Sequence, residues 1–304
     1  MKLHKLYITA AIVCLTAAAC GSSAEEQKRK SAEERAQLRA KEEKAFKIGV
    51  MPTLDCLPVF LAKDHGFFEK QGADIRLKRF TAQMDCDTAL TGGSVQAIVS
   101  DLVRAERMMK QGTSLRYVTA TNTYWQLIAN HKARVKEVKQ LGDKMMAMTR
   151  YSATDFLGDL FVSEAKPANM VYRIQINDVV IRLKMLLNNE MDAVWLTEPH
   201  ATAARLAKNP VLADSRDKDL NLGVIVAQTR EMGGERRSRQ LEAFIKAYNE
   251  ACDSINKYGT GHYQQVIEKY CQVDAATVKA LPKQKFAHAA PPRQSDIDRA
   301  RKAF

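Results

Sequence analysis

Short apolar segments alternate with helix-like segments from Phe46 to the C-terminus, and this alternation constrains the fold more than any other feature. Segments of strand length and composition lie at residues 46–51, 75–80, 96–99, 115–120, 125–130, 144–149, 172–176, 193–196 and 222–228. Helical periodicity occurs between them at residues 57–66, 88–92, 102–111, 154–165, 178–188 and 198–208, and in a tail at 235–257, 260–272, 274–281 and 294–303. Strands that alternate with helices predict an α/β fold with largely parallel sheets. Two such series and a returning tail predict two lobes joined by crossing strands.

The length and charge of the chain narrow its class. With 304 residues, of which 46% are hydrophobic, the chain is long for one compact domain and suits two lobes. The formal net charge is +12, but the Lys and Arg residues are scattered among acidic ones. Neither aromatic–basic interleaving nor zinc-finger spacing occurs, so we expect no nucleic-acid partner. We also expect the protein to be a monomer.

The first twenty residues have the features of an export signal. Lys2 and Lys5 precede a nearly continuous apolar run from Leu6 to Ala19, which is too short to span a membrane. The run ends in Ala17-Ala18-Ala19-Cys20-Gly21, which resembles a bacterial lipobox with Ala17 in place of the usual Leu. That resemblance implies cleavage before Cys20 and acylation of its thiol. Ordinary cleavage without a lipid is the alternative.

Residues 24–45 are dense in Glu, Lys, Arg, Gln and Ala and contain few large apolar side chains. Such a segment buries little surface, so we expect residues 21–45 to be a charged, solvated tether with helical tendency.

Four cysteines remain in the body after Cys14 and Cys20 are set aside: Cys56, Cys86, Cys252 and Cys271. Exported cysteines tend to pair. Cys56 and Cys86 follow the first two strands, whose ends lie close together in a parallel sheet, and Cys252 and Cys271 flank a helical turn at Gly259-Thr260-Gly261. We therefore predict the disulfides Cys56–Cys86 and Cys252–Cys271. The alternatives are free, buried thiols, or a metal site formed by Cys56 and Cys86 with Asp55 and Asp85.

Three segments carry a resemblance to a known family. They are KIGVMPTLDCLPVFLAKDHGFFEKQGADIRLKRF at 47–80, MDAVWLTEPHATAA at 191–204 and FAHAAPPRQSDIDRARKAF at 286–304. The first resembles the opening of the nitrate/sulfonate/taurine and thiamine-pyrimidine (SsuA-like) family of periplasmic substrate-binding proteins. It matches the family's pattern at Pro58, Phe60, Leu61, Ala62, Gly66, Phe67, Phe68 and Gly72. The other two resemble the family's second-lobe strand and closing segment.

The resemblance implies a type II periplasmic-binding-protein fold of two α/β lobes, each a mostly parallel sheet flanked by helices. Lobe one would comprise residues 46–122 and 222–304, and lobe two residues 123–221. The ligand would bind between the lobes, which would close on it about hinges near residues 122 and 221. General physical rules place the site at the same point, because open parallel sheets bind ligands at the carboxyl ends of their strands.

Candidate ligand-binding residues follow these strands or lie near the crossing between the lobes. They are Thr53, Asp55, Cys56, Gln83, Asp85, Ser100, Asp101, Asn122, Trp125, Tyr151, Ser152, Thr154, Trp195 and Glu198. Tyr151 is the preferred candidate for stacking on a ring, whereas Trp195 could equally be a core residue. The acidic residues indicate a ligand with cationic or donor-rich groups, although Asp87, Asp155 and Asp178 are better explained as helix caps. An anion binder would carry Arg, Lys or bare helix N-termini at these places.

The sequence therefore predicts a lipid-anchored substrate-binding protein of an ABC importer, bound to the cell envelope and facing the periplasm or exterior. The ligand would be a small, nitrogen-rich or cationic heterocycle of the thiamine-pyrimidine type, and the partners an ABC permease and ATPase. The alternatives are a sensing or metal-handling lipoprotein without an importer, and a sulfonate or nitrate binder. We expect no enzyme, cofactor or metal: Cys56 stands where the family's fungal pyrimidine synthase has its reactive histidine, and GxSxG, P-loop, GxGxxG and HExxH motifs are absent.

Overall fold

The computed structural model describes residues 27–230 and 233–303 and divides the chain at Ala45/Phe46 into two compact units. The predicted signal peptide and Cys20 lie outside the described residues. In the first unit, residues 27–44 form one helix whose side chains are almost all exposed, with an Arg29–Glu33 ion pair along one face. The predicted tether is thus helical over its described part. Within the described ranges, no helix combines the length and apolar character needed to cross a bilayer.

The second unit contains two five-stranded sheets, and the first has the order β2-β1-β3-β10-β4. Its strands are β1 (Phe46–Val50), β2 (Ile75–Arg79), β3 (Ala97–Asp101), β4 (Leu115–Ala120) and β10 (Gly223–Gln228). β1 pairs in parallel with β2 and β3, whereas β10 is antiparallel to β3 and β4. Among the described strands of this sheet, β10 alone runs against the others, and it is the strand that returns from the second sheet.

The second sheet repeats this arrangement with the order β7-β6-β8-β5-β9. Its strands are β5 (Gln126–Ala129), β6 (Met145–Met148), β7 (Tyr172–Gln175), β8 (Ala193–Leu196) and β9 (Val211–Asp214). β6 is parallel to β7 and β8, and β5, which arrives from the first sheet, is antiparallel to β8 and β9. The prediction of a two-lobed α/β fold with mostly parallel sheets is confirmed.

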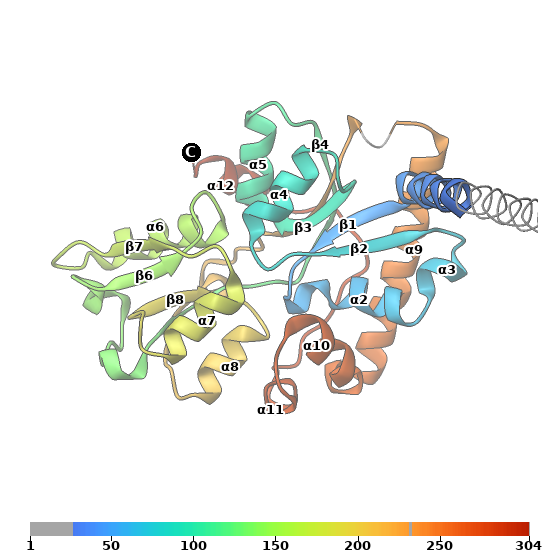
Figure 1. Ribbon diagram of the computed structural model, residues 1–304. Coiled ribbons are helices and arrows are strands. Elements are labelled where there is room, and N and C mark those ends of the chain that lie inside the picture. Colours follow the sequence, from blue (N-terminus) through green and yellow to red (C-terminus); the bar gives the residue numbers. More distant parts are fainter. Residues whose placement is uncertain (1–26, 231–232, 304) are drawn as a thin grey trace, which may run out of the picture. The chain divides into compact units, whose positions relative to one another are not determined.

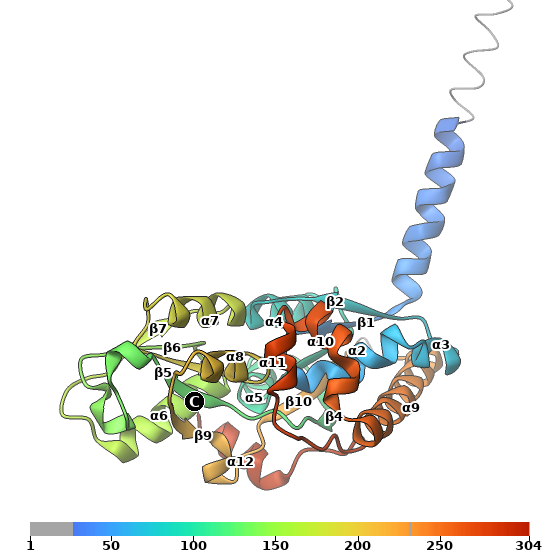
Figure 2. The same cartoon turned by 90° about the horizontal axis from the view of Figure 1, so that it is seen from below.

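Helices cover both faces of each sheet (Figures 1 and 2). On the first sheet, α2 (Leu57–Asp64), α3 (Phe67–Lys70) and α9 (Glu235–Tyr258) lie opposite α4 (Gln83–Thr91) and α5 (Leu102–Lys110). On the second, α6 (Ala153–Ala165) lies opposite α7 (Val179–Leu187) and α8 (His200–Leu206). The tail adds α10 (Gln264–Cys271), α11 (Ala275–Lys279) and α12 (Gln294–Arg301). Because both faces are covered, the inner strands β3, β8 and β10 are buried at every residue, whereas the edge strands β2 and β7 are partly exposed and carry basic residues.

Two chain segments cross side by side between the sheets, after β4 and before β10. The Thr121 N–H donates to the Gly223 carbonyl at 2.9 Å, and Ser215 and Trp125 exchange backbone and side-chain hydrogen bonds at the other end of the crossing. A Cβ atom at Gly223 would overlap the side chains of Thr121 and Thr123, so only glycine allows this close approach. The two crossing segments therefore lie close together and are joined by hydrogen bonds at both ends.

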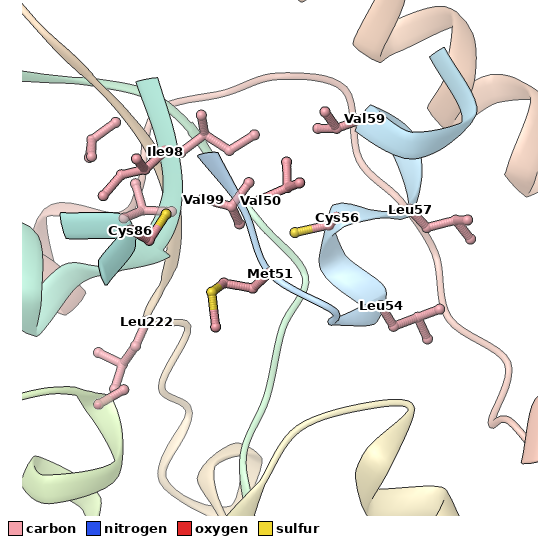
Figure 3. Close-up of a cluster of buried hydrophobic side chains, with 14 of the residues drawn as sticks. Val50, Met51, Leu54, Cys56, Leu57, Val59, Cys86, Ile98, Val99 and Leu222 are labelled. Carbon is pink, nitrogen blue, oxygen red and sulfur yellow. The ribbon is translucent and has the colours of Figure 1, made fainter. Parts of the chain in front are cut away.

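Both predicted disulfides are wrong, because all four body cysteines are free and buried. Cys86 lies on α4, where its sulfur occupies the space left open by Gly49, and Figure 3 shows β1 between it and Cys56. Cys271 is turned away from Cys252 because α10 packs on α2, where the Phe60 and Tyr270 rings stack at 4.3 Å, rather than forming a hairpin with α9. The four thiols thus pack as small apolar groups.

Two elements also differ from the sequence prediction. Residues 83–87, predicted as a loop after the second strand, form the first half of α4. The edge strand β9 was not predicted, because only four residues separate Pro210 from the following turn and they give little periodicity.

Candidate functional site

A small cavity of about 80 Å³ lies between the two sheets, at the carboxyl ends of their parallel strands. Eight of the fourteen predicted ligand-binding residues line it: Thr53, Asp55, Gln83, Ser100, Asp101, Trp125, Ser152 and Thr154. Eight further residues complete the wall: Met51, Val99, Thr123, Thr149, Asn177, Val179, Arg182 and Thr197. Hydroxyl groups thus dominate the polar part of the wall, and Trp125 supplies its aromatic surface.

The lobes touch around this cavity. The Leu54 N–H donates to the Glu198 carbonyl at 2.8 Å, and the Val179 N–H donates to the Thr81 carbonyl at 3.2 Å. At the mouth of the cleft, the Arg107 guanidinium lies 3.7 Å from the centre of the Tyr151 ring across the two lobes. These contacts join the first lobe to the second on several sides of the cavity, so the structure represents a closed cleft.

Asp101 is shared by the two lobes. It is the last residue of β3 and the N-cap of α5, and its Oδ1 accepts the N–H of Arg104 at 3.0 Å. The same Oδ1 also accepts the N–H of Ala153, the first residue of α6 in the other lobe, at 3.0 Å. The residue is only 6% exposed, and burial raises the pKa of its carboxyl to about 6 in spite of the nearby Arg104.

Asp55 is the second carboxylate of the wall. It belongs to the 3-10 turn Leu54–Cys56 that follows β1, and its Oδ2 accepts the Thr121 hydroxyl at 2.9 Å. Burial raises the pKa of this carboxyl, although hydrogen bonds from Thr53 and Thr121 oppose the shift. Neither Asp55 nor Asp101 forms an ion pair with a Lys, Arg or His of the described chain, so both carboxylates are buried in the cleft without a direct ion-pair partner.

Arg182 is the only arginine in the cavity wall formed by described residues, and it projects from the middle of α7. Its guanidinium donates to the carbonyls of Ile176 at 2.6 Å and Trp195 at 2.8 Å, and to the Thr149 hydroxyl at 2.6 Å. It thereby fastens the ends of three neighbouring strands of the second sheet. Burial lowers its pKa to about 10, so it remains charged at neutral pH.

Six predicted site residues lie away from the cavity. Asp85 is exposed on α4, Asn122 donates to the Lys285 carbonyl at 3.0 Å, and Cys56 is buried beside Thr53. Tyr151 is 46% exposed under Arg107, so it stacks on a guanidinium at the cleft mouth and not on a ligand in the cavity. Trp195 points into the core beside Phe161. Glu198 pairs with Arg205 at 2.7 Å and accepts the Tyr124 hydroxyl at 2.8 Å.

Sequence reasoning could have found some of the missing wall residues. Thr149 and Thr197 directly follow β6 and β8, and Asn177 lies two residues after β7, so the rule that selected Ser100 and Asp101 applies to them equally. Arg182 gives no such signal, because only the packing of α7 directs its side chain toward the cavity.

Across the parts of the chain that the structure describes, no three His, Cys, Asp or Glu side chains are grouped to hold a metal ion. His200 is fully buried, and burial lowers its pKa to about 4. It is therefore a neutral core residue.

Two α/β lobes with crossed strands and a cavity at the strand ends define the class of two-lobed periplasmic-binding-protein folds. The chain belongs to the NMT1-like family, whose sequence profile matches residues 39–268. No curated protein sequence matches the chain significantly.

Solved structures of low sequence identity share the fold. The periplasmic aliphatic sulphonate binding protein SsuA of Escherichia coli is 16% identical, with a TM-score of 0.68 over 86% of this chain and 85% of that one. The alkanesulfonate-binding protein SsuA of Xanthomonas axonopodis pv. citri, bound to MOPS, is 17% identical, with a TM-score of 0.70 over 85% and 90%. A zinc-bound ligand-binding component of an ABC-type import system from Staphylococcus aureus is 12% identical, with a TM-score of 0.70 over 85% and 90%. The resemblance to SsuA-like binding proteins stated from the sequence is confirmed.

Proposed function

We propose that this protein is the solute receptor of an ABC-type importer, anchored outside the cytoplasm by a lipid on Cys20. It captures a small, nitrogen-rich or cationic heterocycle of the thiamine-pyrimidine type between its lobes and releases it unchanged to a permease. The observation that carries the choice of ligand is the burial of Asp55 and Asp101 in the cavity wall without a cationic partner.

The charges of the wall favour such a ligand. Two carboxylates face one guanidinium, and the N–H groups of Arg182 are largely engaged by the carbonyls and hydroxyl it fastens. A cationic or amidine-like group would relieve the cost of burying the carboxylates, because a charge-assisted hydrogen bond contributes about 1.5–3 kcal/mol. Trp125 offers a flat surface for a ring, and the Thr and Ser hydroxyls can donate to or accept from ring nitrogens.

The transport role rests on the family and on the closed cleft. Receptors of this class enclose their solute by a hinge motion, and the narrow crossing at Thr121–Gly223 is suited to that motion. What the similar proteins of known structure bind, namely sulfonates in SsuA, suggests the same general role for this chain but not the same ligand.

An anion is the second candidate, and Arg182 is the observation that favours it. A buried guanidinium without a carboxylate at ion-pair distance would attract a sulfonate or nitrate. The two candidates therefore differ in which charged groups of the wall the ligand engages.

Calorimetric titration with 4-amino-5-hydroxymethyl-2-methylpyrimidine, and separately with methanesulfonate and nitrate, decides between them. We expect the wild-type protein to bind the pyrimidine and neither anion. Asp55→Asn should weaken pyrimidine binding about 10- to 100-fold, which corresponds to one charge-assisted hydrogen bond. Asp85→Asn is the matched control, because it removes the same charge from an exposed site on α4 and should leave affinity unchanged.

Mass spectrometry of any solute retained by the purified protein gives an independent answer. Retention of a sulfonate, or pyrimidine binding that Asp55→Asn does not weaken, would overturn the proposed ligand class. Chemical conversion of the bound solute would overturn the proposal that the protein is a receptor and not an enzyme.

A further inference from the structure

Two helices from opposite lobes each donate a backbone N–H of their first turn to the same carboxylate oxygen. α5, of 9 residues, and α6, of 13 residues, both direct a backbone N–H at Asp101 Oδ1 (Figure 1 shows the two helices). The donors are the N–H groups of Arg104 in α5 and Ala153 in α6, each 3.0 Å from the oxygen. Asp101 therefore stands where the positive ends of two helix dipoles converge on the wall of the cavity.

Such a convergence would ordinarily hold an anionic ligand. Backbone N–H groups at helix N-termini bind phosphate, sulfate or carboxylate, and the dipole adds to the attraction. Arg182 lies in the same wall and would reinforce it, because no carboxylate of the described chain lies within ion-pair distance of its guanidinium. Without Asp101, this cavity would carry the elements of an anion site: one guanidinium and two helix N-termini, one from each lobe.

We infer that Asp101 is a specificity-determining residue that acts as a built-in anion. Its carboxylate fills the place that the charged group of an anionic solute would take and leaves the cavity open to neutral and cationic solutes. This inference rests on the proposed function, namely that the cavity is the solute site, and it names the single residue that excludes one class of solute.

The position of the carboxylate supports this role over simple helix capping. An N-cap needs to serve only its own helix, and Ser152 already caps α6 through the Thr154 N–H. The additional bond from Asp101 to Ala153 links the two lobes. Asp55, the other carboxylate of the wall, bonds to Thr121 in its own lobe and reaches no helix of the second lobe among the described residues. Of the two carboxylates in the cavity wall, only Asp101 is placed to compete with an anion for the N-terminus of α6.

Replacing Asp101 tests the inference as a gain of function. Asp101→Ser keeps a side chain that can cap α5 but removes the charge and shortens the group, so the Ala153 N–H becomes free for a ligand. We expect Asp101→Ser to bind nitrate or methanesulfonate at least tenfold more tightly than the wild type in calorimetric titrations. Asp85→Ser is the matched control, since it removes one exposed carboxylate from α4 and should gain no anion affinity.

Two further variants complete the test. Asp101→Asn removes the charge without shortening the side chain, and should gain less anion affinity than Asp101→Ser. If Asp101→Ser fails to fold by circular dichroism, Asp101→Asn carries the test, and it should still bind nitrate more tightly than the wild type. Adding Arg182→Met to Asp101→Ser should reduce the gain, because the guanidinium is the positive charge in the same cavity wall.

The outcomes separate this inference from the proposed function. A folded Asp101→Ser protein that binds neither anion more tightly than the wild type overturns the inference, whatever the pyrimidine result. Wild-type protein that binds nitrate or methanesulfonate as tightly as Asp101→Ser also overturns it. Failure of the wild type to bind the pyrimidine overturns the proposed ligand class alone, because the anion comparison does not use that ligand.

Discussion

Asp101→Asn should change how the stability of the ligand-free protein depends on pH. In the closed cleft the carboxyl is 6% exposed, and burial raises its pKa from 3.8 to about 6. In the unfolded chain the group returns to its ordinary pKa. The folded protein therefore binds the Asp101 proton more tightly than the unfolded chain does.

The direction and size of the effect follow from this difference. A carboxyl with a raised pKa stabilises the fold while it is protonated, and that contribution disappears as the pH rises through about 6. At about 1.4 kcal/mol per pH unit, the loss between pH 4 and pH 7 amounts to about 2.5 kcal/mol. For a body of this size, that corresponds to about 5 °C in Tm.

The assay is thermal unfolding of wild-type and Asp101→Asn proteins, without ligand, at half-unit steps from pH 4 to pH 7.5. The quantity of interest is the difference between the two Tm values, since other titrating groups contribute equally to both. The wild type should lose about 5 °C relative to the variant as the pH rises. A difference that stays constant over this range would contradict the raised pKa of Asp101, because Asp101 would then ionise as freely in the folded protein as in the unfolded chain.

Four further predictions follow from other parts of the chain. Cys20→Ala should release the protein from the membrane fraction, because a buried acyl chain contributes about 0.8 kcal/mol per CH₂; continued retention of the variant would contradict the lipid anchor. The four body cysteines should react with a thiol reagent only after denaturation, since all are buried; fewer than four reactive body thiols in denatured, unreduced protein would show that a disulfide is present. Gly223→Ala should destabilise the protein by about 3 kcal/mol in chemical denaturation, because its methyl group overlaps Thr121; an unchanged midpoint would show that the crossing can widen. Arg205→Met should cost about 3 kcal/mol in the same assay by leaving the buried Glu198 carboxylate without its cation, and a neutral effect would mean that Tyr124 and Thr202 suffice.

The alternation of apolar segments and helices allowed nearly every element of the body to be predicted. Strand ends were predicted to within two residues: the strand predicted at 96–99 extends through Ser100 to Asp101, after which α5 begins. The first turn of α4 was missed because Gln83, Asp85 and Asp87 are polar and the helix has little apolar stripe. The local sequence pattern was therefore sufficient to predict an element wherever that element buries one clearly apolar face.

The rule that residues following parallel strands line the ligand site predicted part of the candidate site. The rest depended on tertiary packing. Thr53, Asp55, Ser152 and Thr154 follow strands and do line the cavity. Of the three aromatic candidates, Trp125 lines the cavity, whereas Tyr151 and Trp195 do not. Every residue of β8 is buried, so alternation could not tell which face Trp195 occupies. The disulfides failed because strand adjacency fixes where loops begin but not on which face of the sheet each cysteine packs.

The order of the strands also bears on how the chain acquires its structure. The second sheet is built from one continuous stretch, residues 126–214, and contains all its own partners. The first sheet remains incomplete until β10 arrives, because β3 pairs with it through Asp101 and Gly223, far apart in sequence. Closing so long a loop carries an entropic cost that the local pairings of the second sheet avoid. During synthesis, β1 to β4 are made first, and one edge of β3 stays unpaired until β10 is available. The second sheet, which lies between β4 and β10 in the sequence, can therefore form before the first sheet is complete.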